Sequence, residues 1–573
     1  MVYAAFVATV AVVLVSILLA RLSYLWILPS PLPDVPHNPI TSALGDAPAI
    51  ARFEKDGQGT FTDFLAHFAS IHGPISQILL PWRRFVVVTD RAEVERLLAG
   101  KTVDTSEKFR DVFATALPNS QMSFPTNETW KKHRRLTGPS MSRRYLERMS
   151  SRVAFGANEL VGLWRAKFAL VGNSAFDAAS DFHMATMDSI INITLGEPLG
   201  CIKSACSILP STYSQSTNIA HLPHPGVHFL YKGGEVLAEG FQRAILSPCP
   251  LLTNWLFTYT SPTWWKHYKR VTSFFIDAIT RSRERQAELG RVGQGLSTNA
   301  DCVLDMIIQR ESQEGAESLG DSHILDELIT YFFAGQDTTA SVLSWLVKYL
   351  PTDPEIQQRL HEEICTVFGA DVESNEPLDF SLLDDPERVP ILEAVVAEAL
   401  RCAAVAPLTS RQRTYCSQGR GNLGQIYPKR QAGHQCIFDF KHPLTRLHTP
   451  IGTQLFFTTG LMGKCEAQWG PDTKEWRPSR WLTSDGAFNR LAGPSIPFGM
   501  GQRSCFGQRL ATIDRLLRLK ILQLKTYLAT MSRVFFFKPV PPEVDTWEAV
   551  ELILRRPKLC YVSLERWDSK IEL

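Results

Sequence analysis

The run 498–507 constrains the fold more than any other part of this 573-residue chain, because it places one cysteine in a glycine-rich loop. The run reads Phe-Gly-Met-Gly-Gln-Arg-Ser-Cys-Phe-Gly. Gly501 and Gly507 allow the backbone to turn tightly and to approach a flat ligand closely. Arg503 precedes Cys505 by two residues and can offer a charge-assisted fork to a carboxylate. The fold therefore has to leave room for a planar, carboxylate-bearing group beside a thiolate.

This combination is typical of haem held by an axial cysteine, a ligand that favours cleavage of the O–O bond. The alternative is a buried structural cysteine in a glycine-rich turn, which would be the better interpretation of an isolated cysteine. The full pattern favours haem. The run resembles the haem-binding loop of the cytochrome P450 superfamily. That resemblance covers essentially the whole chain, and it implies a mainly α fold with small β-sheets, preceded by an N-terminal transmembrane helix.

Composition excludes several other classes of protein. The net charge of +2, with no basic tail, argues against a nucleic-acid binder. The 11 cysteines are odd in number and scattered, which indicates a reducing compartment and no disulfide framework.

Residues 2–20 form an unbroken apolar run, about long enough to cross a bilayer as a helix. Arg21 follows this run, and a basic C-terminal flank places that side in the cytosol. A cleaved signal peptide is the alternative, but it would need a basic start that is absent here. We therefore predict a transmembrane anchor over 1–21, a proline-rich hinge over 22–40 and a catalytic domain over 41–573. Like microsomal members of the superfamily, the protein would be a single-pass protein of the endoplasmic reticulum membrane with a cytosolic catalytic domain.

Apolar residues at helical spacing predict a long helix from Ile324 to Tyr349, with Pro351 ending it. Its middle carries Ala-Gly-Gln-Asp-Thr-Thr over 334–339, where a glycine and three polar side chains interrupt an apolar helix. An exposed face with a tolerated glycine is the alternative. The segment resembles the oxygen-activating segment of the superfamily, which implies that Asp337 and Thr338 deliver protons and that the helix opens locally beside the ligand.

Other residues gain roles from the same resemblance. It implies a buried structural network of Glu398, Arg401 and Arg480 that shapes the cofactor site, although Glu398 and Arg401 alone would read as a surface pair. Trp130 and Arg134 are spaced to project from one helix face, and the resemblance assigns them, with Arg411 and Arg503, to the haem propionates.

Two stretches depart from the superfamily pattern. Residues 411–450 are polar, glycine-rich and about twice the length that the superfamily pattern leads us to expect. Residues 512–522 extend the helix that should follow the cysteine loop. We predict that both are insertions, either surface excursions or translated intron sequence.

The resemblance implies a haem-thiolate monooxygenase that contains haem b and inserts one oxygen atom of O2 into a small apolar substrate. Candidate substrates are secondary metabolites such as terpenoids, or polycyclic aromatic xenobiotics. NADPH would supply electrons through a separate cytochrome P450 reductase, since the chain carries no flavin or dinucleotide fingerprint; cytochrome b5 is a second candidate donor. The alternatives are a haem-thiolate isomerase or peroxygenase, and a pseudoenzyme inactivated by the insertions.

Overall fold

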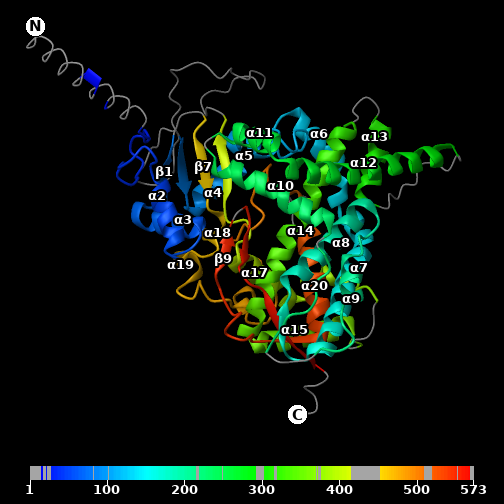
Figure 1. Ribbon diagram of the computed structural model, residues 1–573. Helices are drawn as coiled ribbons and strands as arrows, with labels where there is room; N and C mark the ends of the chain where they lie inside the picture. Colours follow the sequence, from blue (N-terminus) through cyan, green and yellow to red (C-terminus); the bar gives the residue numbers. More distant parts are fainter. Residues whose placement is uncertain are drawn as a thin grey trace, which may run out of the picture. The chain divides into compact units, whose positions relative to one another are not determined.

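The computed structural model describes residues 15–16, 21, 28–81, 83–100, 102–213, 218–226, 228–247, 249–291, 302–314, 319–369, 371, 376–414, 452–493, 495–508, 519–551 and 553–567. These residues form two compact units, one of residues 1–106 with 408–458 and one of residues 107–407 with 459–573. Both units combine helices with small sheets (Figure 1), so the mainly α prediction is confirmed.

The predicted membrane anchor over 1–21 falls outside the described residues, apart from Val15, Ser16 and Arg21. Within the described parts of the chain, no helix combines the length and the apolar character needed to span a bilayer. Of the predicted hinge, residues 29–40 are non-helical, but Leu32 and Val35 are buried. The Gln77 side chain donates to both of their carbonyl oxygens, so this stretch packs on its own unit.

The smaller unit is built on a five-stranded sheet of order β1-β2-β7-β6-β3, in which only the β2–β7 pair is parallel. Its strands are β1 (Ile75–Leu80), β2 (Arg83–Val88), β3 (Val103–Thr105), β6 (Thr409–Arg413) and β7 (Gln454–Phe457), and its helices are α2 (Ala47–Lys55), α3 (Phe61–His72) and α4 (Arg91–Ala99). Three successive valines end β2 and are fully buried, and because successive side chains point to opposite faces, both faces of this strand are covered.

The larger unit contains most of the helices. Its longer helices are α5 (Glu107–Ala114), α6 (Glu128–Thr137), α7 (Arg143–Val171), α8 (Ala179–Leu195), α10 (Phe229–Leu246), α11 (Pro250–Thr260), α12 (Pro262–Arg291), α13 (Val303–Glu314), α14 (Asp321–Tyr349), α15 (Pro354–Phe368), α17 (Pro390–Ala403) and α20 (Leu519–Val534). Its short helices are η1 (Gly138–Met141), α9 (Cys201–Ser207), η3 (Leu350–Thr352), α16 (Phe380–Leu383), α18 (Thr459–Met462), α19 (Glu466–Trp469), η4 (Pro478–Trp481) and η5 (Phe506–Gln508). Its sheets are β5-β4-β11-β8 and β10-β9, made from β4 (Ala175–Asp177), β5 (Ile219–Ala220), β8 (Phe535–Lys538), β9 (Ala549–Glu551), β10 (Arg555–Pro557) and β11 (Tyr561–Arg566).

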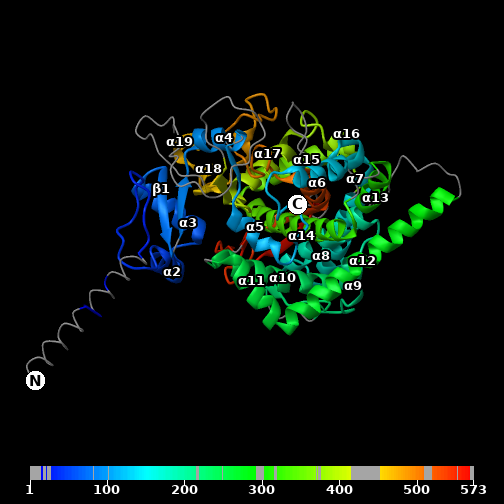
Figure 2. The same ribbon diagram turned by 90° about the horizontal axis from the view of Figure 1, so that it is seen from above.

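Helix α14 runs through the middle of the larger unit, where it packs against α8, α12, α17 and α20 (Figures 1 and 2). It begins at Asp321, three residues before the predicted start, and ends at Tyr349 as predicted. Pro351, in the 3-10 turn η3 that follows, has no N–H with which to continue the α-helix. Its residues from Ile324 to Lys348 are mostly buried, because neighbouring helices cover nearly its whole circumference.

The two predicted insertions lie largely outside the described residues, which exclude 415–451 and 509–518. Of the first predicted insertion, residues 411–414 are described, and 411–413 belong to β6. Of the second, residues 519–522 are described, and they form the start of α20.

Candidate active site

The Cys505 loop is a series of tight turns. Gly499 and Gly501 have φ angles of 70° and 77°, a region that favours glycine over every other residue. The Ser504 N–H donates to the Gly501 oxygen at 3.1 Å, and the Cys505 N–H donates to the Phe498 oxygen at 2.8 Å. Cys505 itself is partly exposed. The glycines therefore fold the loop back on itself, and Cys505 is left partly exposed.

Two guanidinium groups gather on one tryptophan beside this loop. The Arg503 guanidinium carbon lies 4.3 Å from the centre of the Trp130 ring, and that of Arg134 lies 5.1 Å from it. Arg134 also donates to the oxygen of Ser504, at 3.4 Å, and packs over Phe506 at 4.9 Å. The predicted one-face spacing of Trp130 and Arg134 on α6 thus brings both side chains to the residues on either side of the cysteine.

Arg411 belongs to the smaller unit, whereas the cysteine loop belongs to the larger one. It is a buried residue of β6, where its backbone pairs with Thr105 and Leu455 in the smaller unit. Its predicted contact with a propionate stays a prediction.

Helix α14 has one opening in its covered surface. Ala334 is exposed, and Phe333, Asp337 and Thr338 are half-buried, whereas the residues on both sides along the helix are buried. These four positions follow the i, i+1, i+4, i+5 spacing of one helix face. The predicted acid and alcohol therefore lie side by side at a gap in otherwise close packing.

The prediction that the helix opens at Gly335 is wrong. Residues 321–349 form an uninterrupted helix. A β-carbon at Gly335 would lie 2.5 Å from Cδ1 of Ile190, so the missing side chain allows α8 to approach closely. The Thr338 hydroxyl donates to the Ala334 oxygen at 2.7 Å within the helix, which is the usual back-bond of a helical threonine.

Asp337 has a neighbour that sequence reasoning missed. Nδ1 of His183, a buried residue of α8, lies 3.9 Å from Oδ1 of Asp337 and 3.2 Å from Nε2 of Gln336. Burial lowers the pKa of His183, and the negative charge of Asp337 partly opposes that shift. Nothing local in the sequence marks His183, because its partners are more than 150 residues away along the chain.

A row of phenylalanines runs from the same opening. Phe333 contacts Phe241 with ring centres 6.1 Å apart, Phe241 contacts Phe113 at 4.9 Å, and Phe113 contacts Phe109 at 5.1 Å. The row joins α14, α10 and α5, and its α14 member Phe333 shares a helix face with Asp337 and Thr338.

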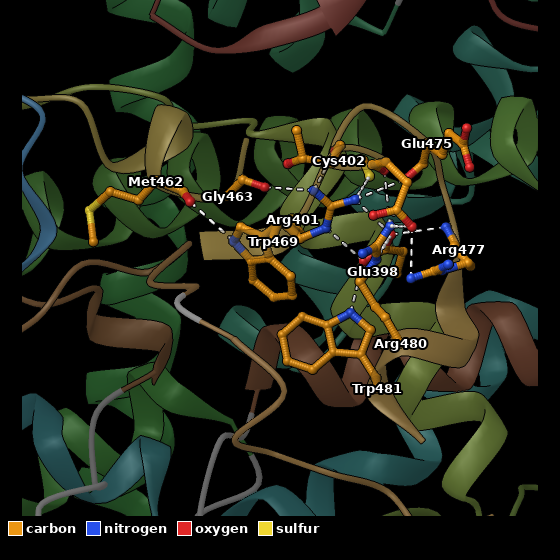
Figure 3. Close-up of polar contacts among 12 residues, drawn as sticks. Glu398, Arg401, Cys402, Met462, Gly463, Trp469, Glu475, Arg477, Arg480 and Trp481 are labelled. Carbon is orange, nitrogen blue, oxygen red and sulfur yellow. Dashed lines mark hydrogen bonds and ion pairs between the residues drawn. The ribbon is translucent and has the colours of Figure 1, made fainter. Parts of the chain in front are cut away.

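The structure brings Glu398, Arg401 and Arg480 together in a buried network (Figure 3). Arg401 donates to both oxygens of Glu398 at 2.7 Å, and Nε of Arg480 donates to Oε1 at 2.9 Å. Nη1 of Arg401 also donates to the oxygens of Gly463 and Thr473. The network thus fixes α17 against the chain that leads to the cysteine loop.

Sequence reasoning missed one member of this network. Nε1 of Trp481 donates to Oε2 of Glu398 at 2.8 Å, and the Trp481 ring packs on Trp469 (Figure 3). Trp481 follows Arg480 directly, so a search for a donor next to each arginine could have found it.

The donor set in this part of the larger unit fits a haem. A haem carries two carboxylates on a flat apolar ring, and the structure supplies two guanidinium groups beside Trp130. The partly exposed Cys505 lies two residues beyond Arg503, in a loop whose Phe506 ring stacks on Tyr331 of α14 with centres 5.6 Å apart. Soft thiolate sulfur is a suitable ligand for iron.

Comparison with known proteins agrees with this chemistry. The profile of the cytochrome P450 family matches residues 44–417 and 433–563. Cytochrome P450 monooxygenase GME11363 of Pestalotiopsis microspora is 27% identical, over 96% of this chain and 97% of that protein. Cytochrome P450 monooxygenase TRI13 of Fusarium sporotrichioides is 26% identical, over 96% of this chain and 98% of that protein. Cytochrome P450 monooxygenase xilC of Penicillium crustosum is 25% identical, over 95% of this chain and 93% of that protein. The chain therefore belongs to the cytochrome P450 family of haem-thiolate, oxygen-incorporating oxidoreductases.

Proposed function

We propose that the protein is a membrane-anchored monooxygenase in which Cys505 is the axial ligand of haem b. Arg134 and Arg503, held on Trp130, would bind the propionates, with Arg411 as a further candidate. The observation that carries this proposal is the gathering of both guanidinium groups beside the cysteine loop. When bound, haem iron with a thiolate ligand supplies the cleavage of the O–O bond.

Asp337 and Thr338 would manage protons at the opening on α14. The Thr338 hydroxyl now donates to the Ala334 oxygen, and its oxygen keeps lone pairs that can accept a hydrogen bond from water. To pass a proton outward, the hydroxyl would rotate away from that carbonyl. Asp337, whose side chain is 42% exposed, would take up a proton from solvent water and pass it on to the Thr338 hydroxyl, as a positioned acid does in general acid catalysis.

The substrate would be a small apolar molecule. The row of phenylalanines from Phe333 to Phe109 supports this proposal, because its rings form a continuous apolar series that ends on the α14 face of Asp337 and Thr338. A terpenoid-like secondary metabolite and a polycyclic aromatic compound both fit this chemistry. Electrons would come from NADPH through a separate reductase, with cytochrome b5 as a second candidate donor.

A face of α11 supports attachment to the endoplasmic reticulum membrane in addition to the predicted anchor. Leu251, Leu252, Trp255, Leu256 and Tyr259 are each 47–68% exposed and follow one helix face. Aromatic and aliphatic side chains on one face are suited to the membrane interface.

For the domain organisation we propose an anchor over 1–21, a hinge over 22–40 and a catalytic domain over 41–573. The family match skips residues 418–432, which supports an insertion within 411–450. It continues through 512–522, so the second insertion rests on the sequence pattern alone.

The test is the spectrum of the reduced, carbon monoxide-bound protein. Cys505→Ala should remove the Soret band typical of thiolate ligation, because the loop contains no other soft anionic ligand. Cys465→Ala, a change at another partly exposed cysteine of the same unit, is the matched control and should leave the band in place. An unchanged band in the Cys505 variant would contradict the assignment. Absence of haem uptake by the unmodified chain would indicate a pseudoenzyme.

A further inference from the structure

Segment 119–126 lies between α14 and the cysteine loop and contacts both. On the side that faces α14, three successive residues of this segment form hydrogen bonds with side chains of that helix. The Asn119 N–H donates to Asp326 at 2.7 Å, and the Ser120 hydroxyl lies 2.7 Å from that of Thr330. Gln121 donates to Glu327 through its backbone N–H and its side-chain Nε2, both at 2.7 Å.

On the other side, the same segment supplies acceptors to Arg503. Nε of Arg503 donates to the Thr126 hydroxyl at 2.8 Å, and Nη2 donates to the Phe124 oxygen at 2.7 Å. Nη1 donates to the Gln121 oxygen at 3.3 Å. Gln121 therefore has its N–H on Glu327 and its carbonyl oxygen on Arg503, so a shift of this one residue changes both contacts.

Glu327 also holds the helix on which Arg503 packs. Nδ1 of His133, on α6, lies 2.7 Å from Oε1 of Glu327, and both side chains are fully buried. An ionised carboxylate can only accept hydrogen bonds, so Nδ1 of His133 carries the proton in this contact. His133 follows Trp130 by three residues on the same helix. The carboxylate of Glu327 thus holds two structures in place. One is segment 119–126, which accepts hydrogen bonds from Arg503, and the other is helix α6, whose Trp130 ring packs on the Arg503 guanidinium group.

We propose that Glu327, together with His133, is a positioning residue that orients Arg503 over Trp130 beside the cysteine loop. This inference deepens the proposed function, because it rests on Arg503 as a group that binds a carboxylate of the cofactor. Glu327 acts through Gln121 and His133, and it touches no reacting atom.

Glu327→Gln is the informative variant because it preserves shape and changes the donor pattern. Both oxygens of Glu327 accept N–H groups. A glutamine there has one acceptor oxygen. Its N–H2 group would either face the backbone N–H of Gln121 and the ring N–H of His133, or force the Gln121 amide to turn over, and every remaining hydrogen bond would lose the assistance of the negative charge. The expected consequence is a shift of Gln121 and a looser Arg503.

The first measurement is amide hydrogen exchange in the full chain, with and without haem. Glu327→Gln should speed exchange in a peptide that covers 119–126, with little change in α7 or α8. The matched control is Asp181→Asn, which changes another buried carboxylate of the larger unit, one that accepts from Lys167 and Trp164. This control should leave exchange in 119–126 as it is. Unchanged exchange in the Glu327 variant, or equal acceleration in the control, would overturn the inference.

The second measurement is the rate at which haem leaves for an excess of apomyoglobin. Glu327→Gln should raise this rate about tenfold, the change expected when a hydrogen bond to a charged group is lost. In an Arg503→Gln background the same change should have no further effect. Equal acceleration in both backgrounds would mean that Glu327 acts by general stabilisation, and it would overturn the positioning role.

The two proposals fail in different ways. If Arg503→Gln alone leaves haem loss unchanged, the binding role of Arg503 is wrong, and the orienting role of Glu327 toward the cofactor is wrong with it. If Arg503→Gln speeds haem loss and Glu327→Gln does not, the proposed function survives and the positioning role is overturned.

Discussion

Two glutamates of the larger unit, Glu398 and Glu327, are equally buried but have different hydrogen-bond partners. Glu398 accepts from the side chains of Arg401, Arg480 and Trp481, and from the backbone N–H of Arg477. Glu327 accepts from His133 and from the backbone and side chain of Gln121. One carboxylate faces two guanidinium groups, and the other faces one imidazole and two neutral amides.

The difference shows two uses of a buried charge. Guanidinium groups stay charged at any pH that a folded protein tolerates, so the Glu398 network is a permanent structural tie. The Glu327 cluster contains no arginine, so each of its few directional N–H groups matters more for where the bonded segment lies. The first two of four predictions test this contrast, and the other two extend it to the neighbouring carboxyl Asp326 and to Thr338 on the same helix, in order of decreasing effect on stability.

Arg401→Ala should cost about 3–5 kcal/mol of unfolding free energy, since it leaves Glu398 with a buried and poorly compensated charge. Urea unfolding followed by circular dichroism measures the loss. Arg477→Ala is the control: the Arg477 side chain is half exposed on Asp472, and its backbone N–H to Glu398 is retained. The control should cost less than about 1 kcal/mol. A similar loss of unfolding free energy in the two variants would mean that the burial of the Arg401–Glu398 ion pair does not determine its contribution to stability.

Gln121→Met should destabilise the protein more than Trp481→Phe, although each removes one neutral side-chain donor from a buried glutamate. Hydrogen bonds to charged groups contribute about 1.5–3 kcal/mol, and we expect Gln121→Met near the top of this range and Trp481→Phe near the bottom. The reason is that Glu398 still has two guanidinium partners when the Trp481 N–H is lost. Among the described residues, Glu327 has no guanidinium partner when the Gln121 side chain is lost. The reverse order in urea unfolding would refute the contrast between the two sites.

Asp326→Asn should alter how stability depends on pH. Burial raises the pKa of Asp326 to about 6, although its bond from the Asn119 N–H works in the opposite direction. A carboxyl whose folded-state pKa is raised favours folding most when it is protonated, and this contribution is lost as the pH rises through about 6. From pH 5 to 7.5 the unmodified protein should lose on the order of 1–2 kcal/mol relative to the variant. Parallel stability curves for the two proteins would show that Asp326 does not titrate in this range.

Thr338→Ala should leave the unfolding free energy within about 0.5 kcal/mol, because alanine is a good helix former and the back-bond of threonine adds little. Its effect should instead be on coupling, since a methyl group cannot hold a water or pass a proton. We expect retained haem, continued NADPH consumption with reductase, and more peroxide per product. The measurement is the amount of product and of peroxide formed per NADPH consumed, in the variant and in the unmodified enzyme. Equal coupling in the two proteins would mean that Thr338 has no role in the mechanism.

Local features of the site were readable from the sequence, because they depend on backbone geometry and helical periodicity. Gly501 predicts a tight turn before Cys505, and the structure adds a second one at Gly499. The spacing of Trp130 and Arg134 predicts one helix face, and Pro351 predicts where α14 ends. The mainly α architecture follows from the same periodicity, and the resemblance to cytochrome P450 added the roles.

The partners across the fold were decided only by the tertiary structure. Glu327 meets Gln121 and His133 over about 200 residues of chain, and no local spacing encodes such a pairing. Gly335 looked like an opening for a ligand, but the close approach of Ile190 on α8 explains it. Periodicity determines which face of a helix is apolar, whereas the packing of whole helices determines which side chain fills each gap and which donor meets each buried carboxylate.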